Sequence, residues 1–297
     1  MNNAGRLISI DPEHIRPAGA RPESVPAGPA GRILTGGLAA DIFLCAECSS
    51  TFDVAWQFAG NNLLPEWSSV LALRQTSGRG QLRRSWYSPP GNLYASIRLP
   101  ELFVREASAP VLTALLFVKA FAKLGLRLQF KWPNDLTLCG GEDDTPGKLG
   151  GLLLEDREDI LLAGVGINCV KRPEGRLLRE NAALPARVLP KDFSLRSPVR
   201  LWIELVQSLI FIYNNTFINI STGQLLLQAE EYLLWKGSNI QVLGAFTDDS
   251  VTAGILCGLT EQGGLRLLVP CAEDVFPEES RKFEEVEVYA GSVRSVA

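Results

Sequence analysis

The sequence predicts an α+β protein, in which a mixed β-sheet with flanking helices is followed by a small all-β domain. Helix and strand periodicities alternate from Asp41 to about Trp235, whereas only short strand patterns follow Lys236 and Gly237. The 297 residues are 46% hydrophobic and 21% charged, an ordinary globular composition with enough apolar residues for a large core. This length suits about two domains.

Residues 1–37 form a Pro/Gly-rich leader in this prediction. Regular helix is prevented by its prolines, Pro12, Pro17, Pro22, Pro26 and Pro29. A helix-turn-helix needs about three amphipathic helices, which do not fit here, and the net charge of −4 also opposes a dedicated nucleic-acid binder. We therefore expect no DNA binding.

No membrane or export segment is expected. The longest apolar stretch, Ile160 to Ile167, is far shorter than the roughly 20 residues that a membrane helix needs. A basic segment followed by an apolar run, the pattern of a secretory signal, does not open the chain. The prediction is a cytoplasmic protein without membrane contact.

The predicted first domain covers residues 38–235. Its expected strands are short apolar or alternating runs at residues 42–48, 69–74, 92–99, 127–132, 150–155 and 160–168. The last two form a hairpin around the charged turn 156–159. Its expected helices have apolar residues at a spacing of three and four and cover residues 50–59, 109–124, 198–217 and 223–235. Gly125 ends the second of these helices, and Ser197 with Pro198 begins the third.

The predicted second domain covers residues 236–297. Its expected strands are 239–243, 251–259, 264–269 and 283–289, and residues 261–264 form a hairpin turn. About 60 residues of this pattern suit a small SH3-like barrel.

Histidine and cysteine usage excludes several classes of chemistry. The single histidine, His14, lies in the leader, so no Ser-His-Asp, Cys-His or two-histidine zinc site is available. Cys45 and Cys48 form a C-x-x-C, but the other four cysteines are scattered and do not complete a zinc site. We expect buried, reduced thiols and identify no metal ligands. The chemistry must then depend on Arg, Lys, carboxylates, backbone amides and Mg²⁺.

The strongest candidate for a binding segment is Gln75–Trp86. Between Glu66 and Glu101 there are five arginines and no acidic residue. Glycines let backbone amides approach an anion, and guanidinium groups bind phosphate or carboxylate oxygens. The plain alternative is a solvated basic hairpin loop.

Three further segments also admit a structural and a functional interpretation. Lys131–Asp135 follows a strand, where α/β sheets often place ligands, or it is a proline-containing turn. In Gly147–Glu155 a lysine precedes an apolar strand, either beside a ligand or in solvent. Gly164–Asn168 ends a buried strand. The side-chain amide of Asn168 either hydrogen-bonds the edge of a ligand or closes a turn.

Taken together, these segments resemble the biotin protein ligases in order and spacing. The family's pattern runs Ser-Thr, Gln-Thr-x-Gly-Arg-Gly-Arg, Lys-Trp-Pro-Asn-Asp, Lys-Leu-x-Gly and Gly-x-Gly-x-Asn. The matching residues here are Ser50-Thr51, Gln75–Trp86, Lys131–Asp135, Lys148–Gly151 and Gly164–Asn168. The resemblance covers about residues 41–297 and implies a class II synthetase-like catalytic fold with an SH3-like C-terminal domain.

The resemblance implies that biotin's carboxylate attacks the α-phosphate of ATP, with Mg²⁺ present, to give biotinyl-5′-AMP. A lysine of a biotin carboxyl carrier protein, belonging to acetyl-CoA carboxylase or a related enzyme, then takes the biotinyl group. The roles carried over by position fall into three groups: Arg79, Lys148 and Asp135 as catalytic residues; Ser50, Thr51, Phe52, Gln75, Arg79, Gly80, Gln81 and Lys148 at biotin; and Arg84, Trp86, Lys131, Asn134 and Asn168 at ATP. Within these groups, Lys148 contacts the carboxylate and Asp135 orients or deprotonates the incoming lysine.

The chain departs from the family's pattern at two places. The family commonly has Ser-Thr-Asn where this chain has Ser50-Thr51-Phe52. The family's second loop arginine, which helps to hold the loop over the adenylate, is replaced by Gln81, and Arg83 follows two positions later. These changes bear on how firmly the loop retains the intermediate.

Two alternatives stay open at this point, and so does a homodimer. A lipoyl or octanoyl transferase shares the fold, and Cys169 beside Asn168 leaves room for a cysteine nucleophile. A biotin-responsive regulator is the second alternative, which the proline-rich leader opposes.

Overall fold

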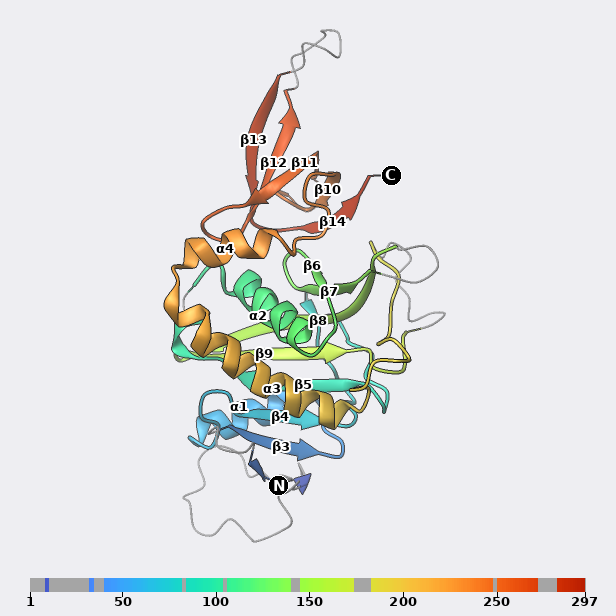
Figure 1. The fold of residues 1–297 in the computed structure, drawn as a ribbon, viewed down its shortest axis with the longest axis vertical. Coiled ribbons are helices and arrows are strands. Elements are labelled where there is room, and N and C mark those ends of the chain that lie inside the picture. The colour runs from blue at the N-terminus through green and yellow to red at the C-terminus, as the bar shows by residue number, and fades with distance from the viewer. Residues whose placement is uncertain are drawn as a thin grey trace.

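The computed structural model describes residues 9–10, 32–34, 40–81, 84–103, 106–139, 145–173, 183–247, 250–271 and 282–296. Its larger sheet has nine strands, with β1-β3-β4-β5-β9-β8-β7-β6 in order and β2 also paired to β3 (Figure 1). The strands are β1 Ser9–Ile10, β2 Arg32–Leu34, β3 Asp41–Cys45, β4 Ser69–Ala72, β5 Leu93–Arg98, β6 Gln129–Lys131, β7 Asp135–Leu138, β8 Gly147–Arg157 and β9 Ile160–Ile167. The pairs β1/β3 and β3/β4 are parallel and the others antiparallel, so the sheet is mixed as predicted.

Helices cover both faces of this sheet. Helix α1, Thr51–Gly60, packs on one face, while α2 Ala109–Lys123, α3 Pro198–Asn215 and α4 Thr222–Glu230 pack on the other (Figure 1). Alternation along the strands produces this division: on β4, Val70 belongs to the core under α1 and Leu71 to the core under the other helices. No helix among the described residues is long and apolar enough to cross a membrane.

The C-terminal part is a five-stranded antiparallel sheet, with β13-β12-β11-β10-β14 in order. Its strands are β10 Asn239–Leu243, β11 Val251–Leu259, β12 Leu265–Pro270, β13 Phe283–Val288 and β14 Ser292–Ser295. Its apolar residues continue the main core. Glu230 of α4 accepts a hydrogen bond from the Leu259 amide at 2.8 Å, and the Trp132 indole donates to the Gly263 carbonyl at 2.8 Å. The second sheet is therefore docked through specific polar contacts as well.

The predicted elements are confirmed, with four differences. Strand β14, Ser292–Ser295, was not expected. Helix α4 ends at Glu230, not at Trp235, because Phe130 on β6 exchanges backbone hydrogen bonds of 2.9 Å with Tyr232 and Leu234. Strand β7 was not expected, because its four residues follow directly on the Pro-Asn turn. Strands β1 and β2 lie within the predicted leader, and most of that leader, His14 included, is outside the described residues.

Candidate functional site

A cluster of neutral polar side chains lies at the start of α1. Ser50 is the N-cap, and its hydroxyl accepts from the Phe52 amide. The Gln75 amide oxygen accepts from the Thr51 backbone at 2.8 Å, and the Thr51 hydroxyl bonds the Ser96 hydroxyl at 2.7 Å. Because Ser50, Thr51 and Ser96 are buried, these contacts fix the positions of their polar groups.

Gln75 connects this cluster to the glycine-containing loop. Its amide nitrogen donates to the Ser88 hydroxyl at 3.0 Å, and Ser88 donates to the Trp86 carbonyl at 3.0 Å. A Cβ at Gly78 would lie 2.5 Å from the Ser88 hydroxyl oxygen and 2.6 Å from the Trp86 carbonyl oxygen. Only glycine therefore fits where the loop crosses this network.

The loop is a tight hairpin between Gly78 and Trp86. The Gly80 amide donates to the Arg84 carbonyl and the Trp86 amide to the Gly78 carbonyl, both at 2.8 Å. Gln81 and Arg84 are exposed near the tip, and Arg83 is outside the described residues. The described residues of the predicted anion loop therefore pair as the two arms of a hairpin.

Arg79 lies on the first arm of this hairpin and contacts two carboxylates. Its guanidinium pairs with Asp53 of α1 and, at 3.1 Å, with Glu155 of β8. It also lies 5.7 Å from the ring centroid of Phe52, which is buried in the core under α1. A Cβ at Gly164 would lie 2.3 Å from the Phe52 ring, so this ring is packed directly on β9.

The Trp86 indole lies over the two central strands of the sheet. Cβ atoms added at Gly166 and Gly151 would lie 2.6 Å and 3.4 Å from it, so glycines on β9 and β8 make room for the ring. The ammonium of Lys148 lies 5.2 Å from the ring centroid. Trp86 Nε1 is buried and, within the part of the chain that the structure describes, has no hydrogen-bond partner.

Two lysines and one aspartate form the charged end of the site. The Asp135 carboxylate lies 2.5 Å from Lys148 Nζ and 3.2 Å from Lys131 Nζ. Burial alone would raise the pKa of Asp135, but the two ammonium groups outweigh it and lower that pKa below its ordinary value. Asp135 therefore stays ionised, and the three groups together carry one net positive charge.

Strand pairing explains why these three side chains meet. Lys131 ends β6 and is paired with Asp135, which begins β7. Asp135 is in turn paired with Gly151 on β8, and an irregularity between Leu136 and Thr137 shifts the register toward Lys148. The Lys148 backbone is held on its other side by Pro185 and Arg187, through hydrogen bonds of 2.7 and 2.8 Å.

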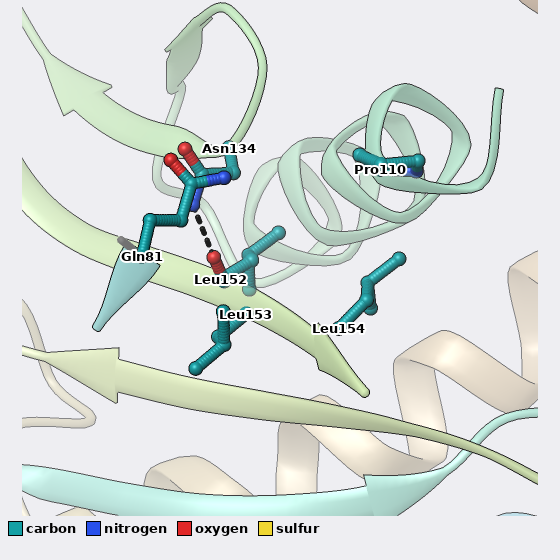
Figure 2. Close-up of a pocket in the computed structure, with 6 residues that line it drawn as sticks. All are labelled: Gln81, Pro110, Asn134, Leu152, Leu153 and Leu154. Atoms are coloured by element: carbon teal, nitrogen blue, oxygen red, sulfur yellow. Dashed lines mark hydrogen bonds between the residues drawn. The ribbon is translucent and has the colours of Figure 1, made fainter. Parts of the chain in front are cut away.

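The two predicted asparagines close the site at different places. The Asn134 side chain is buried and donates to the Leu152 carbonyl, and with Gln81 it lines a small pocket between β8 and the start of α2 (Figure 2). Asn168 is buried at the end of β9, where its backbone N–H donates to the Leu149 carbonyl at 2.9 Å.

A continuous series of contacts joins six of the fourteen predicted site residues. It runs from Thr51 through Gln75, Ser88 and Trp86 to Lys148, and from there to Asp135 and Lys131. Four contributing residues were not predicted, namely Asp53, Ser88, Ser96 and Glu155. Asp53, Ser88 and Ser96 were given no role from the sequence, and Glu155 ends the segment Gly147–Glu155 but was not assigned a role there.

The expectation of buried cysteines holds for three of the six. Cys45, Cys48 and Cys169 are buried, whereas Cys139 is exposed and Cys257 and Cys271 are partly exposed. Burial raises the pKa of both Cys48 and Cys169 to about 12, so these thiols stay protonated near neutral pH. The described residues contain no group of three or more His, Cys, Asp or Glu that could hold a metal ion.

Sequence comparison shows the family of the chain. Residues 45–171 match the Biotin/lipoate A/B protein ligase family. The biotin–[acetyl-CoA-carboxylase] ligase of Paracoccus denitrificans is 33% identical over 222 residues, which are 70% of this chain and 87% of that protein. The bifunctional ligase/repressor BirA of Bacillus subtilis is 36% identical over 132 residues; the match covers 42% of this chain and 39% of that relative.

Solved structures show the same fold. A biotin protein ligase from Aquifex aeolicus in complex with biotin and ATP is 25% identical, with a TM-score of 0.61 over 86% of this chain and 99% of that one. The biotin acetyl coenzyme A carboxylase synthetase from Helicobacter pylori is 17% identical, with a TM-score of 0.52 over 84% of this chain and 100% of that one. The expected two-part fold, with a C-terminal β domain, is confirmed.

Proposed function

We propose, because this chain belongs to the biotin/lipoate A/B protein ligase family, that it is an ATP-dependent biotin protein ligase. It would convert biotin and ATP to biotinyl-5′-AMP and transfer the biotinyl group to a lysine of a biotin carboxyl carrier protein. The observation that carries this proposal is the contact series from Thr51 to Lys131, which joins a neutral polar cluster to a cationic one. A cytoplasmic location, where ATP is abundant, goes with it.

The neutral end suits biotin's ureido ring. Ser50, Thr51 and Gln75 offer hydroxyl and amide groups whose orientations the protein already fixes. An uncharged ring with both donors and acceptors is recognised by such groups without any net charge. We assign these three residues to the ring, and Phe52 to the wall beside it.

The charged end suits the reaction. In the first step a biotin carboxylate oxygen forms a bond to the α-phosphorus and the bond to the pyrophosphate oxygen breaks. Both reactants are anions, so a cation held at their meeting point lowers the barrier. Lys148 would supply that charge, and Asp135 would hold the ammonium in place rather than accept a proton, since its pKa is lowered.

In the second step the acceptor amine attacks the biotinyl carbonyl carbon, and AMP leaves as the C–O bond to phosphate breaks. Lys148 would then face the acyl-phosphate. Trp86 Nε1, which has no hydrogen-bond partner among the described residues, would donate to a ligand oxygen, since buried donors are normally satisfied. Gly80 and Gln81 would follow the bound biotin and its phosphoryl group, while Arg84, Lys131, Asn134 and Asn168 would surround the nucleotide.

Mg²⁺ has no ligand set among the described residues. Mg²⁺ is usually held by one or two carboxylates together with substrate phosphates. The site carboxylate, Asp135, has both oxygens on ammonium groups. The residues therefore do not fit a resident ion, and Mg²⁺ would enter only as part of the MgATP substrate.

The test incubates the full chain with MgATP, biotin and a biotin carboxyl carrier domain, and measures the mass of the acceptor. One biotinyl group is expected on the carrier, and none on a carrier whose acceptor lysine is changed to arginine. A parallel reaction with lipoate or octanoyl donors distinguishes the related transferases. Modification by those donors and not by biotin would overturn the proposal.

A further inference from the structure

We infer that Asp53 and Glu155 are positioning residues that anchor the glycine-rich hairpin through Arg79, and that Arg79 is the anchor point of the loop rather than the cation that meets the substrates. This inference rests on the proposed function for its consequence and on protein contacts alone for its geometry. We call Asp53, Arg79 and Glu155 the clamp.

The clamp joins three elements that are distant in sequence. Asp53 lies in the first turn of α1, Arg79 on the hairpin, and Glu155 near the end of β8. The carboxylates are themselves held: the Ser49 hydroxyl donates to Asp53 at 2.7 Å, and the Trp56 indole donates to Glu155 at 2.8 Å. Both acceptors for Arg79 are therefore fixed by neighbours.

The positive charge of Arg79 is already compensated. Arg157 also contacts Glu155, at 3.2 Å, so two carboxylates and two guanidinium groups form a neutral set. The Phe52 ring lies beside the Arg79 guanidinium and adds a cation–π contact. Lys148, whose cluster keeps one net positive charge, is better suited to meet an incoming anion.

Fixing Arg79 also fixes the position of the Trp86 indole, which lies over the central strands. Arg79 and Ser85 are paired across the hairpin, and the next residue, Trp86, lies over Gly151 and Gly166. Release of the first arm would therefore loosen the second arm and its indole. The Phe52 found in place of the family's asparagine gains a physical role here, as the aromatic surface beside the clamp.

The first test uses ligand-free protein. Hydrogen exchange is measured for the Gly80 and Trp86 amides in wild type, in the double variant Asp53→Asn/Glu155→Gln, and in Asp156→Asn. Asp156 is the exposed neighbour of Glu155 on β8, so this variant is a control for the loss of one negative charge beside the clamp. Loss of the partly exposed pairs should speed exchange about fivefold in the double variant only. Equal exchange in all three proteins would overturn the clamp.

The dependence of hydrogen exchange on salt distinguishes a clamp held by charge from a purely structural role of the same residues. Raising NaCl from about 0.05 M to about 0.5 M should speed exchange in wild type, because ions screen partly exposed charge pairs. The double variant should show little response, and Arg79→Lys, which keeps the charge, should retain the wild-type salt response. A double variant as salt-sensitive as wild type would count against the inference.

The last test concerns the intermediate. Enzyme loaded with biotinyl-AMP should release it about fivefold faster in the double variant than in wild type or Asp156→Asn. If wild type forms no biotinyl-AMP, the proposed function fails, and hydrogen exchange still decides the clamp. If wild type forms it and both proteins release it equally, the retention role of the clamp is overturned.

Discussion

The two ends of the site are organised by different forces. At the neutral end, Thr51, Gln75 and Ser96 are fixed by uncharged hydrogen bonds. At the charged end, Lys131, Asp135 and Lys148 are held by opposite charges, with one positive charge in excess. The neutral end is therefore complementary to an uncharged ligand group, and the charged end is complementary to two anionic groups.

Because of this difference, ligand binding at the neutral end and chemistry at the charged end should respond differently to pH and salt. Uncharged hydrogen bonds depend little on pH or salt, whereas a charged cluster responds to both. Binding of the neutral ligand portion should be steady across conditions, while chemistry at Lys148 should vary. The following substitutions test that separation, beginning with the largest expected effect.

Asp135→Asn is expected to have the largest effect, because it leaves Lys131 and Lys148 adjacent with no counter-charge. Removing one partner of a largely buried pair should lower the free energy of unfolding by about 3 kcal/mol at neutral pH. Chemical denaturation of variant and wild type measures this difference.

The stabilisation that Asp135 provides through Lys131 and Lys148 depends on pH. The pKa of Asp135 is lowered from its ordinary 3.8, so the unfolded chain binds its proton at a higher pH than the folded protein does. Its contribution is complete above the ordinary pKa and is lost as pH falls from about 4 through the lowered value. The gap between wild type and Asp135→Asn should therefore shrink in acid. A gap that stays constant down to pH 3 would contradict the charge-based account.

Lys148→Ala should sharpen the comparison kinetically. Loss of a charge-assisted bond is worth about 1.5–3 kcal/mol, so adenylate formation should slow at least tenfold. Pre-steady-state measurement of biotinyl-AMP formation provides the rate, and biotin affinity should change little because Lys148 is not part of the neutral end. Wild-type kinetics would remove Lys148 from the reaction.

Much of this arrangement follows from local sequence. Ser50 predicts the start of α1, because a serine before an amphipathic run is a typical N-cap. The sequence also singles out Gly147–Glu155 and Gly164–Asn168, and Trp86 lies over Gly151 and Gly166 of these segments. Helix and strand periodicity is enough to predict most strands of the mixed sheet, whereas the roles of the site residues are predictions that rest on the resemblance of these motifs to the biotin protein ligases.

The unpredicted part depends on contacts between distant segments. Asp53 and Glu155 become visible only when α1 and β8 are folded against the hairpin, about a hundred residues apart along the chain. Likewise, α4 ends early because Phe130 pairs with Tyr232 and Leu234, and tertiary pairing overrides a weak helical preference.

Gln81→Arg tests whether the hairpin tip belongs to the charged end. Glutamine donates a hydrogen bond but has no charge and no guanidinium fork. The arginine variant should hold biotinyl-AMP more tightly by about 1–2 kcal/mol, which is roughly a five- to thirtyfold slower release. It should also label a bystander protein less than wild type does. Equal release rates, or more bystander labelling by the variant, would refute this role for Gln81.

Thr51→Val tests the neutral end with a substitution of similar shape. It removes the hydroxyl that bonds Ser96 and leaves a buried hydroxyl unpaired, which costs about 1 kcal/mol. The biotin KM should rise about fivefold, equally at low and high salt and across pH 6–8. A strongly salt-dependent change would show that the two ends are not separate.

Cys169→Ser should have the smallest effect of these substitutions. A large effect would contradict the assignment of the reaction to the charged end. A cysteine nucleophile beside Asn168 would make the reaction covalent on the protein, with the charged end only assisting. Cys169 is fully buried, and burial raises its pKa to about 12, so the thiolate needed for attack is scarce at neutral pH.

Serine keeps nearly the same shape and can bond the Ile167 carbonyl, which the thiol contacts at 3.7 Å. Acyl transfer by the variant should therefore stay within about twofold of wild type. Loss of transfer, with the variant folded and still binding biotin, would point to a thioester intermediate and to the acyltransferase branch of the family.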